Sequence, residues 1–187
     1  SIGKEEDKMG IRASATAEII FEDCFVPDSA RVGKEGRGFM IAMQTLQMSR
    51  PVVAAISVGI AQAAIEAAVA YSHHRKQFGV KIATFEMVQQ MIADMVMKTE
   101  AARILTYKAC VAQMNKDKKA GLYSAMSKCF ASDTAMEVTT TAVQVMGGNG
   151  YSRENPVEKY MRDAKIMQIY EGTNQVQRLV IANEATF

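Results

Sequence analysis

The chain has 187 residues, which is enough for one domain with a sizeable hydrophobic core. Its 22 Lys and Arg residues nearly balance its 20 Asp and Glu residues. This balance argues against nucleic acid and an anionic membrane surface as partners. The three cysteines are widely spaced without a C-x-x-C pair, which fits a reducing compartment.

The first 34 residues differ in composition from the rest. Residues 15–27, "ATAEIIFEDCFVP", are rich in β-branched and aromatic side chains and end at a proline, which predicts a strand. A single strand is not stable alone, so we expect it to pair with a partner that the sequence does not reveal. Gly33, Gly36 and Gly38 then predict a loop.

Everything after this loop is predicted to be helical. A first helix is expected over residues 39–46, and a long second one over residues 51–74, because proline is tolerated in the first turn of a helix. By length and apolar character the second helix could cross a bilayer. Its many alanines, together with Gln62 and Glu66, favour the central helix of a bundle and no membrane span.

The later helices are separated by glycines and polar runs. Gly79 breaks the chain, and Thr84 can cap a helix. That helix is indicated by apolar residues at helical spacing, namely Phe85, Val88, Ile92 and Met95. The polar run 115–119 followed by Gly121 predicts a turn between helices.

The last third of the chain completes a helical fold. Met126, Phe130, Val138 and Val145 mark another helix face. Gly147-Gly148 should end that helix, and Pro156 should open a short helical turn before Asp163. Three long antiparallel helices and a terminal one predict an all-α, up-down four-helix bundle, preceded by a short β segment.

Glu171 is the strongest candidate for a chemical role. Gly172 ends whatever precedes it, and Thr173 can cap a short helix. That helix carries Val176, Leu179 and Val180 on one face. A carboxylate fixed on such a bend suits a general base. An isolated Glu-Gly-Thr is more often an ordinary surface glutamate near a helix start, where the helix dipole favours acids.

The two histidines do not indicate a metal site. His73 and His74 are adjacent, so on a helix their side chains point about 100° apart. The chain has no Glu-x-x-His pair, and the ligand sets typical of zinc are absent from its sequence. We therefore expect no metal.

Residues 161–182, "MRDAKIMQIYEGTNQVQRLVIA", closely resemble the C-terminal signature of the acyl-CoA dehydrogenase family. Four further segments resemble family segments and occur in family order: "MGIRASATAEIIFEDCFVP", "GRGFMIAMQTLQMSRPVVAA", "RKQFG" and "QVMGGNGY". The resemblance covers essentially the whole chain. It implies that residues 1–34 are the end of a middle β-domain and residues 35–187 a C-terminal helical-bundle domain, so we expect the chain to be an incomplete fragment.

The resemblance implies FAD-dependent α,β-dehydrogenation of short- or medium-chain acyl-CoA to trans-2-enoyl-CoA. Glu171 would be the base that abstracts the α-proton, its backbone N–H would donate to the thioester carbonyl, and a hydride would pass to the flavin. Some relatives place the base on the helix that carries Ser49. Since Ser49 is not acidic, the chain resembles the short- and medium-chain group.

The resemblance also implies which residues bind the ligands. Those implied for FAD are Arg75, Gln77, Phe78, Gln144, Gly147, Gly148, Thr173 and Gln175. Those implied for the acyl-CoA substrate are Arg50, Tyr170 and Gly172. In the family the segment containing Arg75 contacts FAD largely from a neighbouring subunit, so a homodimer or homotetramer is expected.

The implied electron acceptor is an electron-transfer flavoprotein, and the implied location is the bacterial cytoplasm or, alternatively, the mitochondrial matrix. Two other functions remain open at this point. The chain could belong to an acyl-CoA oxidase-like flavoprotein, which reactivity of the reduced flavin with oxygen would reveal. It could also be a cofactor-free helical oligomerisation module, which would lack the yellow colour of a flavin.

Overall fold

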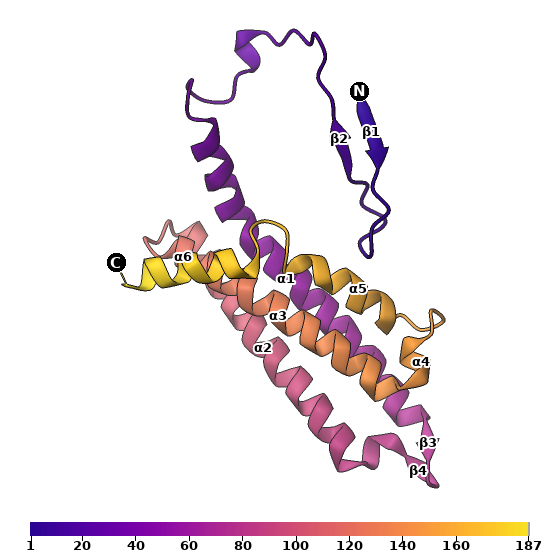
Figure 1. Cartoon of the computed structure of the whole chain (residues 1–187). Helices are drawn as coiled ribbons and strands as arrows, with labels where there is room; N and C mark the ends of the chain where they lie inside the picture. Colours follow the sequence, from indigo (N-terminus) through magenta and orange to yellow (C-terminus); the bar gives the residue numbers. More distant parts are fainter. Residues whose placement is uncertain (187) are drawn as a thin grey trace.

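The computed structural model describes residues 1–186, and most of them are α-helical (Figure 1). The long helices are α1 (Gly38–His74), α2 (Glu86–Met114) and α3 (Ala120–Met146). The shorter ones are α4 (Gly148–Tyr151), α5 (Val157–Met167) and α6 (Asn174–Thr186), with 3-10 turns at Asp28–Ala30 and Ile82–Thr84. The strands are β1 (Ile2–Glu5), β2 (Ala17–Ile19), β3 (Lys76–Gln77) and β4 (Val80–Lys81).

Helices α1, α2, α3 and α5 alternate in direction and form the bundle (Figure 1). α3 lies at its centre, in contact with α1, α2, α5 and α6. α6 crosses the end of the bundle at which α3 begins (Figure 1). The prediction of an all-α, up-down bundle with a small β remnant is confirmed.

The core is built largely from alanine. Its main cluster consists of Ala61, Ala64, Ile65, Ala68, Met95, Ala135, Val138, Ala142, Val145, Met146, Val157 and Ala164. A second cluster consists of Ala54, Val58, Ala102 and Ala131. Small side chains at facing positions let helix axes approach closely. A larger side chain at one of these positions would overpack the core and destabilise the fold.

The prediction of two helices separated near Pro51 is wrong, because α1 continues from Gly38 to His74 with Pro51 inside it. Proline cannot donate to the carbonyl four residues earlier, which here belongs to Gln47. That carbonyl accepts a hydrogen bond from the Gln113 side chain of α2 instead, at 2.9 Å. The same amide donates to Ser124 of α3 at 2.9 Å. One side chain therefore replaces the missing helical hydrogen bond and links α1, α2 and α3.

Replacing Gln113 by methionine is expected to lower the free energy of unfolding by ~1–3 kcal/mol, because the half-buried Gln47 carbonyl loses the Gln113 donor. In a Pro51→Ala background the Gln47 carbonyl regains a helical N–H, and the same replacement should cost clearly less. Urea denaturation of the four proteins in this double-mutant cycle measures the difference. An equal cost in both backgrounds would show that Gln113 does not compensate for Pro51.

The partner of the predicted strand lies within this chain, which corrects the expectation that the sequence does not show it. β2 pairs antiparallel with β1, and Ile19 lies opposite Ile2. The strand is also shorter than residues 15–27, since only residues 17–19 make regular ladder pairs. β1 is short and half polar, so its composition did not identify it as a strand.

The segment between β1 and β2 is attached to α5. The Ile11 N–H donates to the Asp163 carboxylate at 2.6 Å, and Arg162 donates to the Met9 carbonyl at 2.7 Å. Gly10 lies against the α5 backbone so closely that a Cβ there would be 2.5 Å from the Arg162 carbonyl oxygen. This docking holds the β remnant beside the helix that leads to Glu171.

Several predicted boundaries can be compared with the structure. The turn at residues 115–119 and the end of α3 before Gly147 are confirmed. Thr84 does not cap α2, because its hydroxyl donates to the Lys81 carbonyl instead. Gly121 is buried inside α3 rather than in the turn, and α5 has 11 residues where a short turn was expected. The domain boundary near residue 34 stays a prediction.

Helix α1 is long and apolar enough to cross a membrane by length and composition, and 44% of its most apolar window is buried within the molecule. The core helix of a helical bundle passes the same test, and α1 packs against α2, α3 and α5. The absence of a membrane span therefore stays a prediction.

Candidate active site

Glu171 lies on a tight turn between α5 and α6. The turn begins after Met167 and is closed by the Asn174 N–H, which donates to the Gln168 carbonyl at 3.0 Å. Both central residues have left-handed backbone angles, with φ +55° at Glu171 and +89° at Gly172. A glycine reaches such angles freely, whereas a glutamate does so only when its surroundings impose them. The expected fixed bend is therefore present.

Residues of α1 face the Glu171 carboxylate. The Ser49 hydroxyl donates a hydrogen bond to Glu171 Oε2 and also lies 3.1 Å from the Leu46 carbonyl oxygen. The next residue, Arg50, is half buried, and its Nε has no hydrogen-bond partner within residues 1–186. Burial lowers the pKa of Arg50, while the charges of Glu171 and Glu184 act in the opposite direction. The positive charge of Arg50 is thus close enough to the Glu171 carboxylate to interact with it, and its buried Nε is left without a partner.

Tyr170 lies between the turn and an apolar cavity. Its hydroxyl donates to the Met167 sulfur at 3.0 Å, and burial raises its pKa, with the neighbouring Glu171 charge acting in the same direction. The cavity has a volume of about 460 Å³. Its lining is Lys8, Met9, Gly10, Ile11, Ser14, Thr16, Arg162, Lys165, Ile166, Ile169 and Tyr170. Most of these residues were missed, because no local pattern shows that residues 8–16 reach α5.

The inner face of α6 is polar. Thr173 does cap the helix, accepting from the Val176 N–H at 3.3 Å. The apolar face is not buried, however, since Val176 and Leu179 are 46% and 66% exposed. The buried side instead carries Asn174 and Gln177. α6 is thus held by hydrogen bonds to polar side chains of its inner face.

The main residue that sequence reasoning missed is Lys128 of α3. It is fully buried, and its ammonium group donates to the Gly172 carbonyl at 2.9 Å and to Asn174 Oδ1 at 2.8 Å. Burial lowers its pKa to about 8. A lysine among the small residues Ser124, Ser127 and Ala131 is a weak signal of a buried charge, because such neighbours leave room for its stem.

Asp133, one turn further along α3, binds the same segment. It accepts hydrogen bonds from Gln168 at 2.6 Å, Asn174 at 2.7 Å and Arg178 at 2.6 Å. Burial alone would raise the pKa of Asp133, but these hydrogen bonds outweigh it, and the pKa lies below its usual value. Both ends of the Glu171 turn are therefore fixed to α3.

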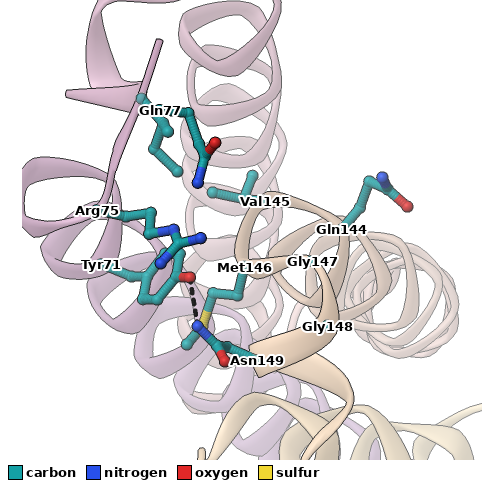
Figure 2. A pocket seen from close by; sticks show the side chains of 10 residues that line it. Tyr71, Arg75, Gln77, Gln144, Val145, Met146, Gly147, Gly148 and Asn149 are labelled. Carbon is teal, nitrogen blue, oxygen red and sulfur yellow. Dashed lines mark hydrogen bonds between the residues drawn. The ribbon is translucent and has the colours of Figure 1, made fainter. Parts of the chain in front are cut away.

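Five of the residues implied for FAD gather around one cavity (Figure 2), at the end of the bundle where β3, β4 and α4 lie (Figure 1). They line a cavity of about 380 Å³, whose lining is Tyr71, Arg75, Gln77, Ile82, Gln144, Val145, Met146, Gly147, Gly148 and Asn149. Tyr71 and Asn149 are joined across it by a hydrogen bond of 2.6 Å (Figure 2). Within residues 1–186 the Arg75 guanidinium makes no hydrogen bond or ion pair, so it is free to bind an anion.

Phe78 is not part of this cavity. It lies with Gly79 on a two-residue hairpin turn between β3 and β4, at φ +52° and 93% exposed. Left-handed angles are rare for so bulky a residue and cost ~1–3 kcal/mol when imposed. Thr173 and Gln175 line another cavity next to Asp133, which shares Lys165 and Ile169 with the cavity beside Tyr170 but no residue with the one around Arg75. One copy of the chain therefore places the implied FAD residues in three different locations.

Within the described residues, no group of three or more His, Cys, Asp or Glu side chains is placed to hold a metal ion. The three cysteines are free thiols in the structure, and burial raises the pKa of Cys129.

The chain is similar to known proteins over nearly its whole length. It matches the family model described as acyl-CoA dehydrogenase, C-terminal domain, over residues 36–186. It is 53% identical to the probable acyl-CoA dehydrogenase FadE25 of Mycobacterium tuberculosis, covering 97% of this chain and 47% of the relative. It is 48% identical to the mitochondrial short-chain specific acyl-CoA dehydrogenase of Mus musculus, with 97% and 44% covered. The chain thus spans about half the length of the curated relatives it matches.

Two solved structures have the same fold as the chain. Butyryl-CoA dehydrogenase from Megasphaera elsdenii superposes with a TM-score of 0.97 at 50% identity, over 100% of this chain and 49% of that one. A chain in the structure described as the electron transferring flavoprotein of Acidaminococcus fermentans superposes with a TM-score of 0.97 at 55% identity, over the same shares. The chain therefore belongs to the acyl-CoA dehydrogenase family, whose C-terminal domain it contains.

Proposed function

We propose that the protein dehydrogenates short- or medium-chain acyl-CoA thioesters to trans-2-enoyl-CoA with FAD as cofactor. The observation that carries the proposal is the Glu171 carboxylate, held on a rigid turn against Ser49 and Arg50. The names of the relatives, which include a short-chain specific acyl-CoA dehydrogenase and a butyryl-CoA dehydrogenase, support the substrate class.

The residues of the turn suit removal of a proton next to a thioester carbonyl. The Glu171 carboxylate takes the α-proton, and a positioned general base of this kind contributes ~10²–10⁴ in rate. The backbone N–H of Glu171 donates to the thioester oxygen, where negative charge develops as the proton leaves. The charge of the half-buried Arg50, which interacts with that of Glu171, would attract a polar group of the substrate. When bound, the flavin accepts the hydride from the β-carbon.

The cavity around Arg75 fits the anionic part of FAD. A guanidinium binds two phosphate oxygens at once, and this one has no acid as partner within the described chain. Gly147 and Gly148 would place a Cβ in open space, so their backbone is accessible to a ligand. The largely apolar cavity beside Tyr170 suits an apolar ring or acyl chain.

The distribution of these residues supports a site shared between subunits. Arg75 and the exposed Phe78 lie at the opposite end of the bundle from Glu171 (Figure 1). A single FAD bound near Glu171 would then receive Arg75 and Phe78 from a second copy. We therefore propose a homo-oligomer, either a dimer or a tetramer.

We further propose that an electron-transfer flavoprotein accepts the electrons, which the similarity to a chain in the Acidaminococcus fermentans structure supports. The bacterial relatives favour the bacterial cytoplasm, and the mouse relative keeps the mitochondrial matrix as the alternative.

We also propose that this chain is part of a longer protein, because it covers only 47% of a curated relative. The proposed activity is tested on that natural-length protein. Loaded with FAD and given an artificial electron acceptor, the protein should convert butyryl-CoA to a product two hydrogen atoms lighter by mass spectrometry. Oxygen consumption in place of acceptor reduction would indicate an oxidase. Failure to bind FAD would favour the helical oligomerisation module.

Replacing Phe78 by asparagine is expected to change stability and cofactor binding in opposite directions. Asparagine tolerates the left-handed turn, and the exposed ring buries little surface, so the free energy of unfolding should rise by ~1 kcal/mol. FAD affinity should fall, because the ring would contact the cofactor from a second subunit. Urea denaturation and flavin absorbance measure the two effects.

Val80→Asn is the matched control, since Val80 is a neighbouring exposed residue outside the left-handed region. Unchanged FAD affinity in Phe78→Asn would remove Phe78 from the proposed cofactor site.

A further inference from the structure

Lys128 is unusual because, within residues 1–186, its ammonium group donates only to one short segment outside its own helix. The side chain is fully buried in α3, where an unpaired ammonium group is costly. Its two hydrogen bonds go to the Gly172 carbonyl and to the Asn174 side chain, both next to Glu171. The lowered pKa, about 8, reflects the cost of this burial.

Lys128 is not held there as an ion-pair partner. The nearest acid on its own helix, Asp133, is bonded to Gln168, Asn174 and Arg178. Within residues 1–186 no salt bridge joins Lys128 to a carboxylate. The ammonium group therefore donates to neutral acceptors, a backbone carbonyl and an amide oxygen.

A second buried side chain donates to the same carbonyl. Gln177 Nε2 lies 3.1 Å from the Gly172 oxygen and 3.3 Å from the Glu171 oxygen. Gln177 is fully buried, and its own Oε1 has no partner in the described part of the chain. The buried side chains of Lys128 and Gln177 thus both bind the backbone carbonyls of the Glu171–Gly172 turn.

Those peptide groups belong to the most constrained part of the site. Two residues in succession have positive φ, and one of them is the glutamate. Such backbone angles persist only where surrounding contacts over-determine them. The hydrogen bonds from Lys128 and Gln177 are contacts of this kind, because both side chains donate to the Gly172 carbonyl and Gln177 also donates to that of Glu171.

We propose that Lys128 is a positioning residue that, together with Gln177, holds the Glu171–Gly172 turn in its left-handed conformation. Its relevance for catalysis rests on the proposed function of Glu171. The turn fixes the direction of the Glu171 N–H and of its carboxylate, and a misplacement of about 1 Å can cost ~10²-fold in rate. Lys128 itself touches no reacting atom.

The test is hydrogen–deuterium exchange of the natural-length protein, in the variants Lys128→Met and Gln177→Met. Methionine keeps the length and volume of either side chain but removes the donors. Amides of residues 169–177 should exchange about 10- to 100-fold faster in both variants, whereas those of α1 and of the rest of α3 should not change. Lys108→Met, the same replacement at an exposed position of α2, should leave the turn unaffected.

Two results would overturn the proposal. Unchanged exchange at residues 169–177 in both variants would show that the turn keeps its conformation without the hydrogen bonds from Lys128 and Gln177. Faster exchange spread evenly over α1 and α3, with a lower unfolding midpoint, would show that Lys128 supports the whole fold instead. Since Gln177→Met removes no buried charge, it remains informative if Lys128→Met fails to fold.

A kinetic measurement then separates positioning from general stability. If the wild-type protein turns over acyl-CoA, Lys128→Met should lower kcat by at least about tenfold with little change in KM, because the turn acts on the chemical step. An absence of turnover in the wild type would contradict the proposed function, while the exchange result would still decide whether Lys128 holds the turn.

Discussion

Glu171→Gln is expected to lower acyl-CoA turnover by ~10²–10⁴ while leaving FAD binding intact. Glutamine has nearly the same shape and can still accept the hydrogen bond from Ser49, so the turn should keep its geometry. What it cannot do is take up the α-proton. Turnover measured with an artificial electron acceptor gives the loss, and flavin absorbance of the purified variant shows that the cofactor is retained.

Glu184→Gln is the matched control. This exposed glutamate of α6 also interacts electrostatically with Arg50. Its replacement therefore tests whether losing a negative charge near Arg50 is enough to lower turnover. The control should keep wild-type turnover. Wild-type turnover in Glu171→Gln would rule out Glu171 as the base.

Gly172→Ala is expected to lower the free energy of unfolding by roughly 1–3 kcal/mol and to reduce turnover strongly. At φ +89° any side chain is strained, and a Cβ would lie 2.6 Å from Gln177 Nε2. The strain can be relieved only by moving the turn or by displacing Gln177, and either change shifts Glu171. Urea denaturation and steady-state kinetics measure the two losses.

Gly59→Ala is the matched control, and it is expected to stabilise the protein where Gly172→Ala destabilises it. Gly59 lies in α1 with ordinary backbone angles, and a Cβ there would meet nothing within 4 Å. Alanine should therefore stabilise the helix by ~0.5–1 kcal/mol without affecting turnover. If Gly172→Ala were as well tolerated as Gly59→Ala, the left-handed turn would not be required for the site.

The helices could be predicted because their signals are local. Apolar spacing identified α2 and α3, and Gly147 marked the end of α3, since only a glycine easily adopts the angles found there. Pro51 misled the prediction for a non-local reason. Its continuation within α1 depends on Gln113, which is 66 residues away from Gln47 in sequence and cannot be recognised before the helices are packed.

The Glu171 turn was predictable, but its support was not. Gly172 and Thr173 mark a bend and a helix start in any context, and the structure has both. The helix that follows buries polar Gln177 rather than apolar Leu179, because its inner face meets Lys128 and Asp133. A sequence pattern assumes that apolar residues face inwards, so it fails where a buried hydrogen-bond network replaces apolar packing.

The resemblance implies binding residues one at a time, and matching single residues does not show that these residues lie in separate parts of the molecule. Arg75 and Gly148 do share a cavity, whereas Phe78 and Gln175 do not lie in it. A shared site between two subunits would explain the separation, and this explanation stays part of the proposal.

The most direct test of the proposed chemistry is an anaerobic absorbance titration of the natural-length protein, loaded with FAD and then supplied with butyryl-CoA. The flavin band should bleach in the wild type and persist in Glu171→Gln, because reduction of the flavin requires removal of the α-proton. A band that persists in the wild type at saturating acyl-CoA of every chain length tested, or that bleaches equally fast in Glu171→Gln, would contradict the assignment of Glu171 as the base.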